Sequence, residues 1–215
     1  MQLHKSLYAI TDSQLLNDDK LFEAVNAALK GGCKLVQYRD KSNDQPRRFA
    51  EAKTLFALCV KHEAKLIIND DVGLAQEVGA HGVHLGQDDK NPVAARIILG
   101  SNAIIGVTCH DSLALAERAI KDTANYIAFG RFFSSNTKPD APPAPLNLLT
   151  EARTKFPNTS IAAIGGITLE NTKSVLDAGA DLIAVCHSLF AADDIETQAK
   201  LFNAKLLSPL PLGEG

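Results

Sequence analysis

Two short apolar runs in the sequence each end abruptly in acidic residues. The run at residues 66–68 leads into Asp70, and the run at residues 82–85 leads into Asp89. Short apolar runs bounded by turn residues are typical of buried parallel strands, whose carboxyl ends carry the chemistry in α/β proteins. Two carboxylates about 4 Å apart repel each other by roughly 4 kcal/mol at an effective dielectric of about 20. If Asp70 and Asp89 meet at this edge, the pair predicts a bound divalent cation such as Mg²⁺.

Cationic and amide side chains are placed to complete such a site. Gln37, Arg39 and Lys41 alternate at the end of an earlier apolar run, and the period of two in a strand predicts that they share a side. Asn69 precedes the first carboxylate, and Lys138 closes a hydroxyl-rich segment that leads into a cluster of prolines. Cations around an amide, with a further lysine on a loop that closes over substrate, suit a diphosphate held by the metal.

Each of these groups also has an ordinary explanation. Isolated arginines and lysines are mostly solvated. One residue among 69–71 is expected to cap a helix, and residues 131–145 could form a mobile loop without a role. The functional interpretation is favoured because carboxylates and cations are expected to face each other across one rim.

Further polar groups follow the fifth, seventh and eighth apolar runs. Thr108 ends the fifth run with its hydroxyl placed toward a ligand. Gly165 and Gly166 lie at the end of the seventh run and bring bare backbone N–H groups to an expected helix start, a common phosphate site in barrels. Cys186 and His187, after the eighth run, would supply the other half of that phosphate site.

Eight apolar runs must position these groups, and a helical pattern follows each of them. The runs cover residues 7–11, 35–38, 65–68, 82–85, 104–108, 126–130, 161–165 and 182–186. Eight strand–helix units in 215 residues predict an α/β protein with a single-domain (β/α)8 barrel, the TIM barrel. The barrel should span residues 1–207, followed by an irregular C-terminal tail at 208–215. A doubly wound sheet is the competing architecture, but its usual glycine-rich first turn is missing from residues 9–13.

The buried faces of the helices are predicted from apolar residues spaced three or four apart. An apolar residue at every fourth position of residues 21–29 marks one such face. Phe49, Ala52, Phe56 and Val60 repeat the pattern in a longer helix, so we expect these four residues to be buried.

The composition excludes several functional classes. The net charge is −3 and no basic stripe occurs, which argues against a nucleic-acid or membrane-binding surface. The chain shows no signal peptide, and no apolar stretch approaches the length of a membrane span. We therefore expect a cytoplasmic enzyme whose partners are small molecules, with no nucleic acid or membrane among them. The sequence leaves open whether it forms a homo-oligomer.

Neither the cysteines nor a histidine pair indicates a metal site. The four cysteines at positions 33, 59, 109 and 186 are scattered without a paired motif, so we expect reduced, buried thiols. His81 and His84 are three residues apart and would face opposite sides of a strand.

Taken together, the motifs resemble those of the thiamine phosphate synthase family. The similarity is carried by Tyr8-Ala9-Ile10-Thr11-Asp12, Gln37-Tyr38-Arg39-Asp40-Lys41, Ile68-Asn69-Asp70, Gly82-Val83-His84-Leu85-Gly86-Gln87-Asp88-Asp89, Thr137-Lys138 and Ile164-Gly165-Gly166-Ile167-Thr168. Members of that family are TIM barrels that join hydroxymethylpyrimidine diphosphate to hydroxyethylthiazole phosphate and expel pyrophosphate with Mg²⁺. The resemblance implies the same transferase activity, in thiamine biosynthesis.

The resemblance also implies a role for each matching residue. Asp70 and Asp89 would hold the metal. Arg39, Lys41 and Lys138 would act in catalysis by holding the pyrophosphate, together with Asn69. Gln37 and Thr108 would lie against the pyrimidine, whereas Ser135, Thr137, Gly166, Cys186 and His187 would take the thiazole and its phosphate.

The sequence departs from the family pattern at four positions. Arg131 replaces the usual proline, Ser135 a threonine, Thr108 a serine, and His187 a small or hydroxyl residue. The two hydroxyl exchanges retain the donors, whereas Arg131 and His187 change the groups expected near the thiazole phosphate.

Two alternatives remain. A related family of thiazole tautomerases shares the barrel and a Gly-x-Ser/Thr-x-His element, here residues 106–110. Those proteins typically lack the metal carboxylates, so the presence of Asp70 and Asp89 favours a synthase. A non-catalytic ligand-binding barrel is the other alternative, and turnover would distinguish it.

Overall fold

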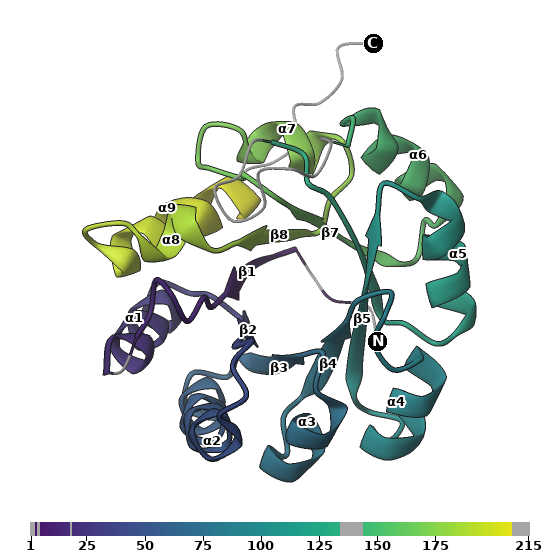
Figure 1. Ribbon diagram of the computed structural model, residues 1–215. Helices are drawn as coiled ribbons and strands as arrows, with labels where there is room; N and C mark the ends of the chain where they lie inside the picture. Colours follow the sequence, from purple (N-terminus) through teal and green to yellow (C-terminus); the bar gives the residue numbers. More distant parts are fainter. Residues whose placement is uncertain (1–2, 4, 18, 134–143, 208–215) are drawn as a thin grey trace.

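Eight parallel strands close into a barrel in the computed structural model, which describes residues 3, 5–17, 19–133 and 144–207 (Figure 1). Each strand pairs with its neighbour in the sequence, and β8 closes the barrel against β1. The strands are β1 (Ser6–Ile10), β2 (Leu35–Tyr38), β3 (Lys65–Asn69), β4 (Gly82–Leu85), β5 (Ile104–His110), β6 (Tyr126–Phe129), β7 (Ser160–Ile164) and β8 (Leu182–Val185). They match the predicted runs to within two residues, so the predicted TIM barrel is confirmed.

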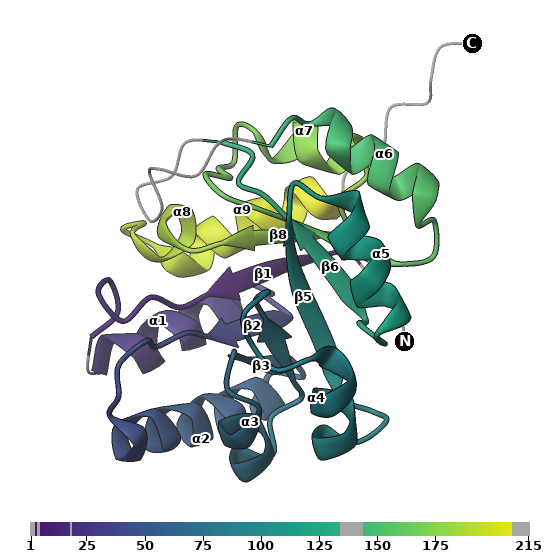
Figure 2. The same cartoon turned by 45° about the vertical axis from the view of Figure 1, so that its right-hand side comes forward.

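Helices form a ring around the barrel (Figure 2). They are α1 (Asp19–Lys30), α2 (Gln45–Lys61), α3 (Val72–Val78), α4 (Pro92–Leu99), α5 (Leu113–Lys121), α6 (Asn147–Lys155), α7 (Thr172–Asp177), α8 (His187–Phe190) and α9 (Ile195–Leu207). The short α8 follows β8 directly, and α9 packs against α1. None of the helices in the described ranges has the length and apolar character of a membrane span. The predicted tail at residues 208–215 lies outside the described residues.

The buried face of α2 differs from the predicted one by about one position. Phe49 and Phe56 are only half-buried, and Val60 is 52% exposed, whereas Ala52 is buried as expected. The buried face consists of Arg48, Ala52, Leu55 and Cys59. The pattern was misleading because a charged residue, Arg48, lies on the inner face, where it forms an ion pair with Asp71.

The interior of the barrel changes from apolar to polar along the strands. The first inward-facing residues of β2 and β5 are Leu35 and Ile104, both buried in an apolar cluster. Further along, β2 and β4 place the buried polar residues Gln37 and His84 inside the barrel, and β5 places Thr108 there. A polar floor therefore lies beneath the carboxyl ends of the strands, where a ligand would sit.

Hydrogen bonds at the amino ends of alternate strands fix the register of the barrel. The residue before each of β4, β6 and β8 accepts a hydrogen bond from a backbone N–H of the preceding strand: His81 Nδ1 from Leu66 (3.0 Å), Asn125 Oδ1 from Ile105 (2.8 Å) and Asp181 Oδ2 from Ile161 (2.9 Å). Two arginines support these acceptors, because Arg96 donates to Asn125 over 2.7 Å and Arg153 forms an ion pair with Asp181.

The histidines and cysteines take the structural roles expected of them. His81 lies against the ring of Phe56, whereas His84 points into the barrel, so the two imidazoles do not share a site. All four cysteines are free thiols, and Cys186 is the one that is not fully buried. Among the described residues, no group of three or more histidine, cysteine, aspartate or glutamate side chains is arranged to hold a metal ion.

Candidate active site

The carboxyl ends of the strands surround a cavity of about 570 Å³, here called the central cavity. Its lining includes many of the predicted substrate-binding residues: Gln37, Arg39, Asn69, Thr108, Gly166, Cys186 and His187. Arg131 lines the same cavity, at a position where the family that the sequence resembles usually has proline. Ser135, Thr137 and Lys138 lie outside the described residues, so their predicted roles remain predictions.

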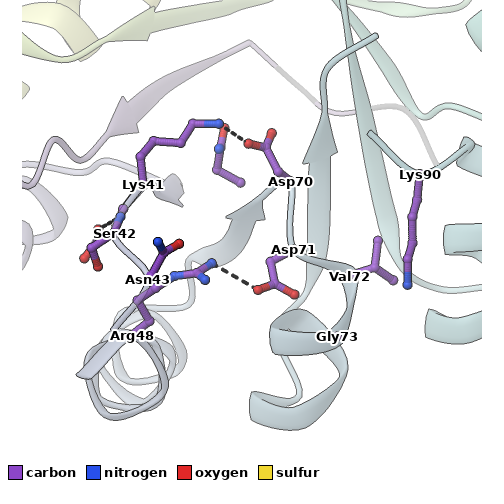
Figure 3. Close-up of a pocket in the computed structure, with 11 residues that line it drawn as sticks. Lys41, Ser42, Asn43, Arg48, Asp70, Asp71, Val72, Gly73 and Lys90 are labelled. Atoms are coloured by element: carbon purple, nitrogen blue, oxygen red, sulfur yellow. Dashed lines mark hydrogen bonds and ion pairs between the residues drawn. The ribbon is translucent and has the colours of Figure 1, made fainter. Parts of the chain in front are cut away.

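A smaller pocket of about 370 Å³ adjoins the central cavity and is here called the side pocket (Figure 3). Asn69 lines both spaces, and Lys41 and Asp70 line the side pocket. The expectation that Gln37, Arg39 and Lys41 share one side is therefore wrong for Lys41. Because β2 ends at Tyr38, the alternation of a strand does not continue as far as Lys41, whose ammonium instead forms an ion pair with Asp70.

The two predicted metal ligands come together at the ends of β3 and β4. The carboxyl groups of Asp70 and Asp89 share a hydrogen bond, and Asp89 Oδ2 also accepts one from the N–H of Gly86 over 2.6 Å. Burial would raise the pKa of Asp70, but its hydrogen bond to Lys41 holds that pKa below the ordinary value. Burial and the neighbouring Asp70 raise the pKa of Asp89.

These carboxyl groups fit a hard divalent cation. The opposite pKa shifts of Asp70 and Asp89 show that the two carboxyl groups interact, and the repulsion between two adjacent carboxylates is relieved when a cation lies between them. Mg²⁺ is usually bound by one or two protein carboxylates together with substrate phosphates and water. The pair Asp70 and Asp89 therefore provides a sufficient donor set beside the cation of Lys41.

The third acid of the run, Asp71, has a structural role. Its Oδ1 accepts a hydrogen bond from the N–H of Leu74 over 2.9 Å and so caps α3. Its Oδ2 lies 3.1 Å from Arg48 Nη2. The three consecutive residues at the end of β3 thus have different roles: Asn69 lines both cavities, Asp70 contacts Asp89, and Asp71 caps α3.

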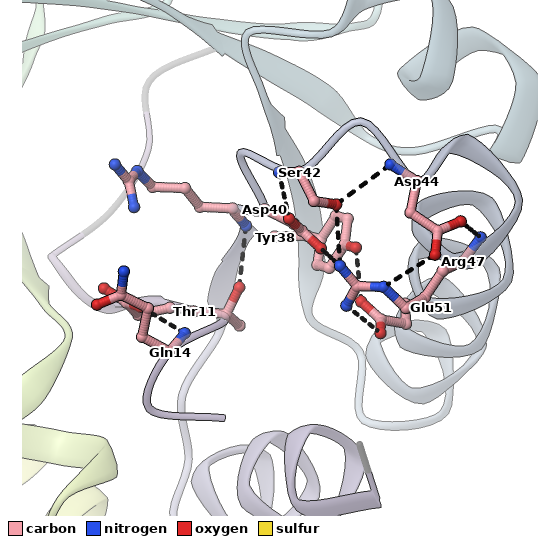
Figure 4. A network of polar contacts seen from close by, with 10 residues as sticks. Thr11, Gln14, Tyr38, Asp40, Ser42, Asp44, Arg47 and Glu51 are labelled. Carbon is pink, nitrogen blue, oxygen red and sulfur yellow. Dashed lines mark hydrogen bonds and ion pairs between the residues drawn. The ribbon is translucent and has the colours of Figure 1, made fainter. Parts of the chain in front are cut away.

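A partly buried network fixes the turn that carries Arg39 and Lys41 (Figure 4). Arg47 donates to Asp40 over 2.6 Å, to Ser42 over 2.9 Å and to Glu51 over 3.1 Å. The hydroxyl of Tyr38 donates to Glu51 over 2.6 Å, and the Asp40 side chain is only 1% exposed. The carboxylate between the two cations, which also lines the side pocket, therefore binds Arg47 and Ser42 and anchors the turn, a role that the sequence did not reveal.

Replacing Asp40 by alanine should loosen this turn. We expect the free energy of unfolding at pH 7 to fall by about 1–3 kcal/mol, because Arg47 loses its most buried partner. Burial alone would raise the pKa of Asp40, but hydrogen bonds from Ser42 and the charge of Arg47 lower it. The stabilisation is therefore present above the ordinary aspartate pKa and is lost as pH falls through the lowered value.

Urea unfolding at pH 7 and at pH 3 measures this effect. The difference between wild type and Asp40→Ala should shrink at the lower pH. Lys200→Ala, which removes an exposed ion pair with Glu196 on α9, is the matched control and should leave stability unchanged. An equal loss in the two variants would show that Asp40 is not an anchor.

Sequence reasoning missed a chain of hydrogen bonds across the barrel interior, here called the interior chain. It links Gln37, Tyr8, Tyr126, His84 and Thr108 in that order. Burial lowers the pKa of His84 to about 4, so its imidazole is neutral at pH 7. Burial also raises the pKa of both tyrosines, which stay protonated. The missed signal was the inward register of the two tyrosines, which puts hydroxyl groups inside the barrel.

A glycine makes the interior chain possible. A Cβ at Gly106 would lie 1.9 Å from the Tyr126 ring, so any side chain there would displace the tyrosine. The motif containing Gly106 therefore contributes space to the barrel interior as well as a hydroxyl from Thr108.

The predicted phosphate site at Gly165 and Gly166 has the expected glycine conformations but lacks the helix that we expected to begin there. Gly165 and Gly166 adopt positive φ angles of 99° and 63°, and a Cβ on Gly165 would lie 2.3 Å from the Cβ of Arg131. However, α7 begins at Thr172, so no helix starts at the glycines as expected. The helix beginning at this edge is α8, at His187, whose side chain is exposed and lines the central cavity.

Comparison with known proteins agrees with the site. The sequence profile of a family described as thiamine monophosphate synthase matches residues 7–189. Thiamine-phosphate synthase from Saccharophagus degradans is 55% identical over 196 residues, which cover 91% of this chain and 90% of that protein. The enzyme of the same name from Marinobacter nauticus is 51% identical over 213 residues, covering 98% and 95%.

A solved structure extends the likeness to three dimensions. Thiamine phosphate pyrophosphorylase from Pyrococcus furiosus superposes with a TM-score of 0.85 at 32% identity, covering 94% of this chain and 95% of that one. The shared fold and the near-complete coverage apply to the whole barrel, including the strand ends that carry the candidate site. This chain therefore belongs to the thiamine monophosphate synthase family.

Proposed function

We propose that this chain is a thiamine-phosphate synthase that joins hydroxymethylpyrimidine diphosphate to hydroxyethylthiazole phosphate, forming a C–N bond and releasing pyrophosphate. The observation that carries the proposal is the meeting of Asp70 and Asp89 beside Lys41, at the edge of a cavity large enough for two ring systems. Family membership supports the same reaction.

In this proposal both rings lie in the central cavity, and the side pocket receives only the diphosphate of the pyrimidine substrate. The pyrimidine would lie in the central cavity against Gln37 and Thr108, with its diphosphate reaching past Asn69 toward the side pocket. The groups that would hold the diphosphate are Arg39, Lys41, Asn69 and Lys138. The thiazole phosphate would be held by Ser135, Thr137, Gly166, Cys186 and His187.

Asp70 and Asp89 would hold Mg²⁺, which when bound would neutralise negative charge on the leaving pyrophosphate. The protein's own cations act on the same charge: Arg39 lines the cavity and Lys41 lies beside the carboxylates. Placing these groups in advance lowers the barrier as the bond to pyrophosphate breaks and a pyrimidine cation forms. The thiazole nitrogen then captures that cation, so the remaining task of the protein is to hold the nucleophile in line.

Such a dissociative reaction needs little acid–base chemistry. The interior imidazole of His84 is consistent with a reaction that needs no acid or base, because both ring nitrogens are hydrogen-bonded to hydroxyl groups and the ring is neutral at pH 7. The substrates are multiply charged and do not cross membranes unaided, so we place the reaction in the cytoplasm.

The direct test is to measure pyrophosphate release from purified protein. Release should require both substrates and Mg²⁺ together, and it should stop when EDTA removes the metal. Binding of both substrates without release would identify a ligand-binding barrel instead. Release without metal would remove Mg²⁺ from the proposal.

His110 separates the synthase from the tautomerase alternative. It lines the central cavity in the Gly-x-Thr-x-His element shared with the tautomerases. A tautomerase would need this imidazole as an acid or base, whereas the coupling reaction does not. We therefore expect His110→Ala to retain most of the coupling activity.

Steady-state kinetics of pyrophosphate release would check this expectation. Thr108→Val is the matched control from the same strand, and it should raise the KM for the pyrimidine substrate. A near-total loss of coupling in a folded His110→Ala protein would contradict our interpretation and favour an acid–base role.

A further inference from the structure

The interior chain joins two residues that lie on strands far apart in the barrel. Gln37 Nε2 donates to the Tyr8 hydroxyl over 2.6 Å, and that hydroxyl lies 2.7 Å from the hydroxyl of Tyr126. His84 bridges Tyr126 and Thr108 through its two ring nitrogens, at 2.9 and 2.8 Å. Gln37 on β2 and Thr108 on β5 both line the central cavity, so each end of the chain is available to a ligand.

The direction of each hydrogen bond in the chain follows from the one before it. When Gln37 donates to Tyr8, the tyrosine proton goes to Tyr126, whose own proton goes to His84 Nδ1. A neutral imidazole with an unprotonated Nδ1 carries its proton on Nε2, which donates to Thr108. The cavity then meets the carbonyl oxygen of Gln37, an acceptor, and the free hydroxyl proton of Thr108, a donor.

Rotating the Gln37 amide reverses every bond in the chain. The amide oxygen then accepts from Tyr8, the imidazole proton moves to Nδ1, and Thr108 donates to Nε2. In this arrangement Gln37 offers N–H to the cavity and Thr108 offers lone pairs. One end of the chain is a donor and the other an acceptor in both directions.

We propose that the interior chain couples Gln37 to Thr108, so that the cavity always offers a ligand one donor and one acceptor. Resting on the proposed function, this selects a heterocycle with an amino group beside a ring nitrogen, as in an aminopyrimidine. A ring that offers only acceptors would either break one bond of the interior chain or leave an acceptor unpaired in the buried barrel interior, where an unpaired polar group is costly. Tyr8, Tyr126 and His84 are then positioning residues that act through Gln37 and Thr108, although Tyr8 and His84 also line the central cavity.

A double-mutant cycle tests the coupling. The dissociation constant of hydroxymethylpyrimidine diphosphate is measured by calorimetry, with Mg²⁺ and without the thiazole, for wild type, Gln37→Met, Thr108→Val and the double variant. Distant sites normally have additive effects. We expect the double variant to bind at least about fivefold more tightly than the product of the two single effects predicts.

Removing one hydrogen bond of the interior chain should abolish that non-additivity. Tyr126→Phe keeps the ring that packs against Gly106 but removes the hydroxyl, and Tyr8→Phe cuts the chain at a second link if the first variant does not fold. In either background the two single effects should multiply. Tyr38→Phe is the matched control, because it loses a tyrosine hydroxyl bond to Glu51 outside the barrel interior, and the coupling should persist there.

The ligand preference is tested with a pyrimidine diphosphate that lacks the amino group. Wild type should bind this analogue about tenfold or more weakly, and the discrimination should shrink in the Tyr126→Phe or Tyr8→Phe protein. Failure of wild type to bind the aminopyrimidine diphosphate would refute the proposed function itself. Normal binding with additive effects in wild type, or with unchanged discrimination after the chain is cut, would overturn the coupling alone.

Discussion

Replacing Asp89 by asparagine should lower kcat/KM for the coupling reaction by about two to three orders of magnitude. The carboxyl of Asp89 shares a hydrogen bond with Asp70, and an amide at this position would take one of two negative charges from the metal site. The fold should remain intact, because Asp89 is exposed and accepts only the N–H of Gly86 besides its contact with Asp70 among the described residues. Steady-state pyrophosphate release as a function of Mg²⁺ concentration measures the effect.

The neighbouring Asp88 provides the matched control. It is also exposed and follows the same strand but, unlike Asp89, it has no hydrogen bond with Asp70 among the described residues, so Asp88→Asn should leave the magnesium dependence unchanged. Circular dichroism would establish that both proteins are folded. Full activity of Asp89→Asn, or of wild type treated with EDTA, would remove the metal from the mechanism.

The second large effect should come from the cations around the leaving group. Charge-assisted hydrogen bonds contribute about 1.5–3 kcal/mol each, so Arg39→Ala and Lys41→Ala should each lose about tenfold to more than a hundredfold in kcat/KM. The loss should fall on the pyrimidine diphosphate, because Arg39 lines the central cavity and Lys41 lies beside Asp70. We predict the same loss for Lys138→Ala, from the sequence alone.

Kinetics with each substrate varied in turn measures these losses. Lys34→Ala is the matched control: this exposed lysine precedes β2 at the opposite end of the barrel and donates to the carbonyl of His62, so its loss should not change activity. If Lys138→Ala weakened only the thiazole substrate, its assignment to the pyrophosphate would be wrong.

The barrel and the placement of most site residues could be read from the sequence because they depend on local patterns. Each apolar run between turn residues became a strand, and the residue after a strand lies at the carboxyl edge wherever the side chain points. Asp70 and Asp89 could be brought together in this way, since β3 and β4 are neighbours in both sequence and space.

Other features could not be predicted because they depend on contacts between distant segments. The inner position of Arg48 depends on Asp71, which lies in the next strand–helix unit. The orientation of Lys41 depends on where β2 ends and on a carboxylate across the rim. The interior chain depends on the register among five strands, β1, β2, β4, β5 and β6, and no single stretch of sequence contains it.

The hydrogen bonds at the amino ends of β4, β6 and β8 place the residues that fix strand register away from the residues that would bind ligands. Their acceptors His81, Asn125 and Asp181 line neither cavity. Strand register is thus fixed at the amino ends of the strands, whereas ligands would bind at their carboxyl ends. A lineage can therefore exchange rim residues, such as Arg131 and His187 in this chain, under selection for a different ligand, without first acquiring compensating mutations in the framework.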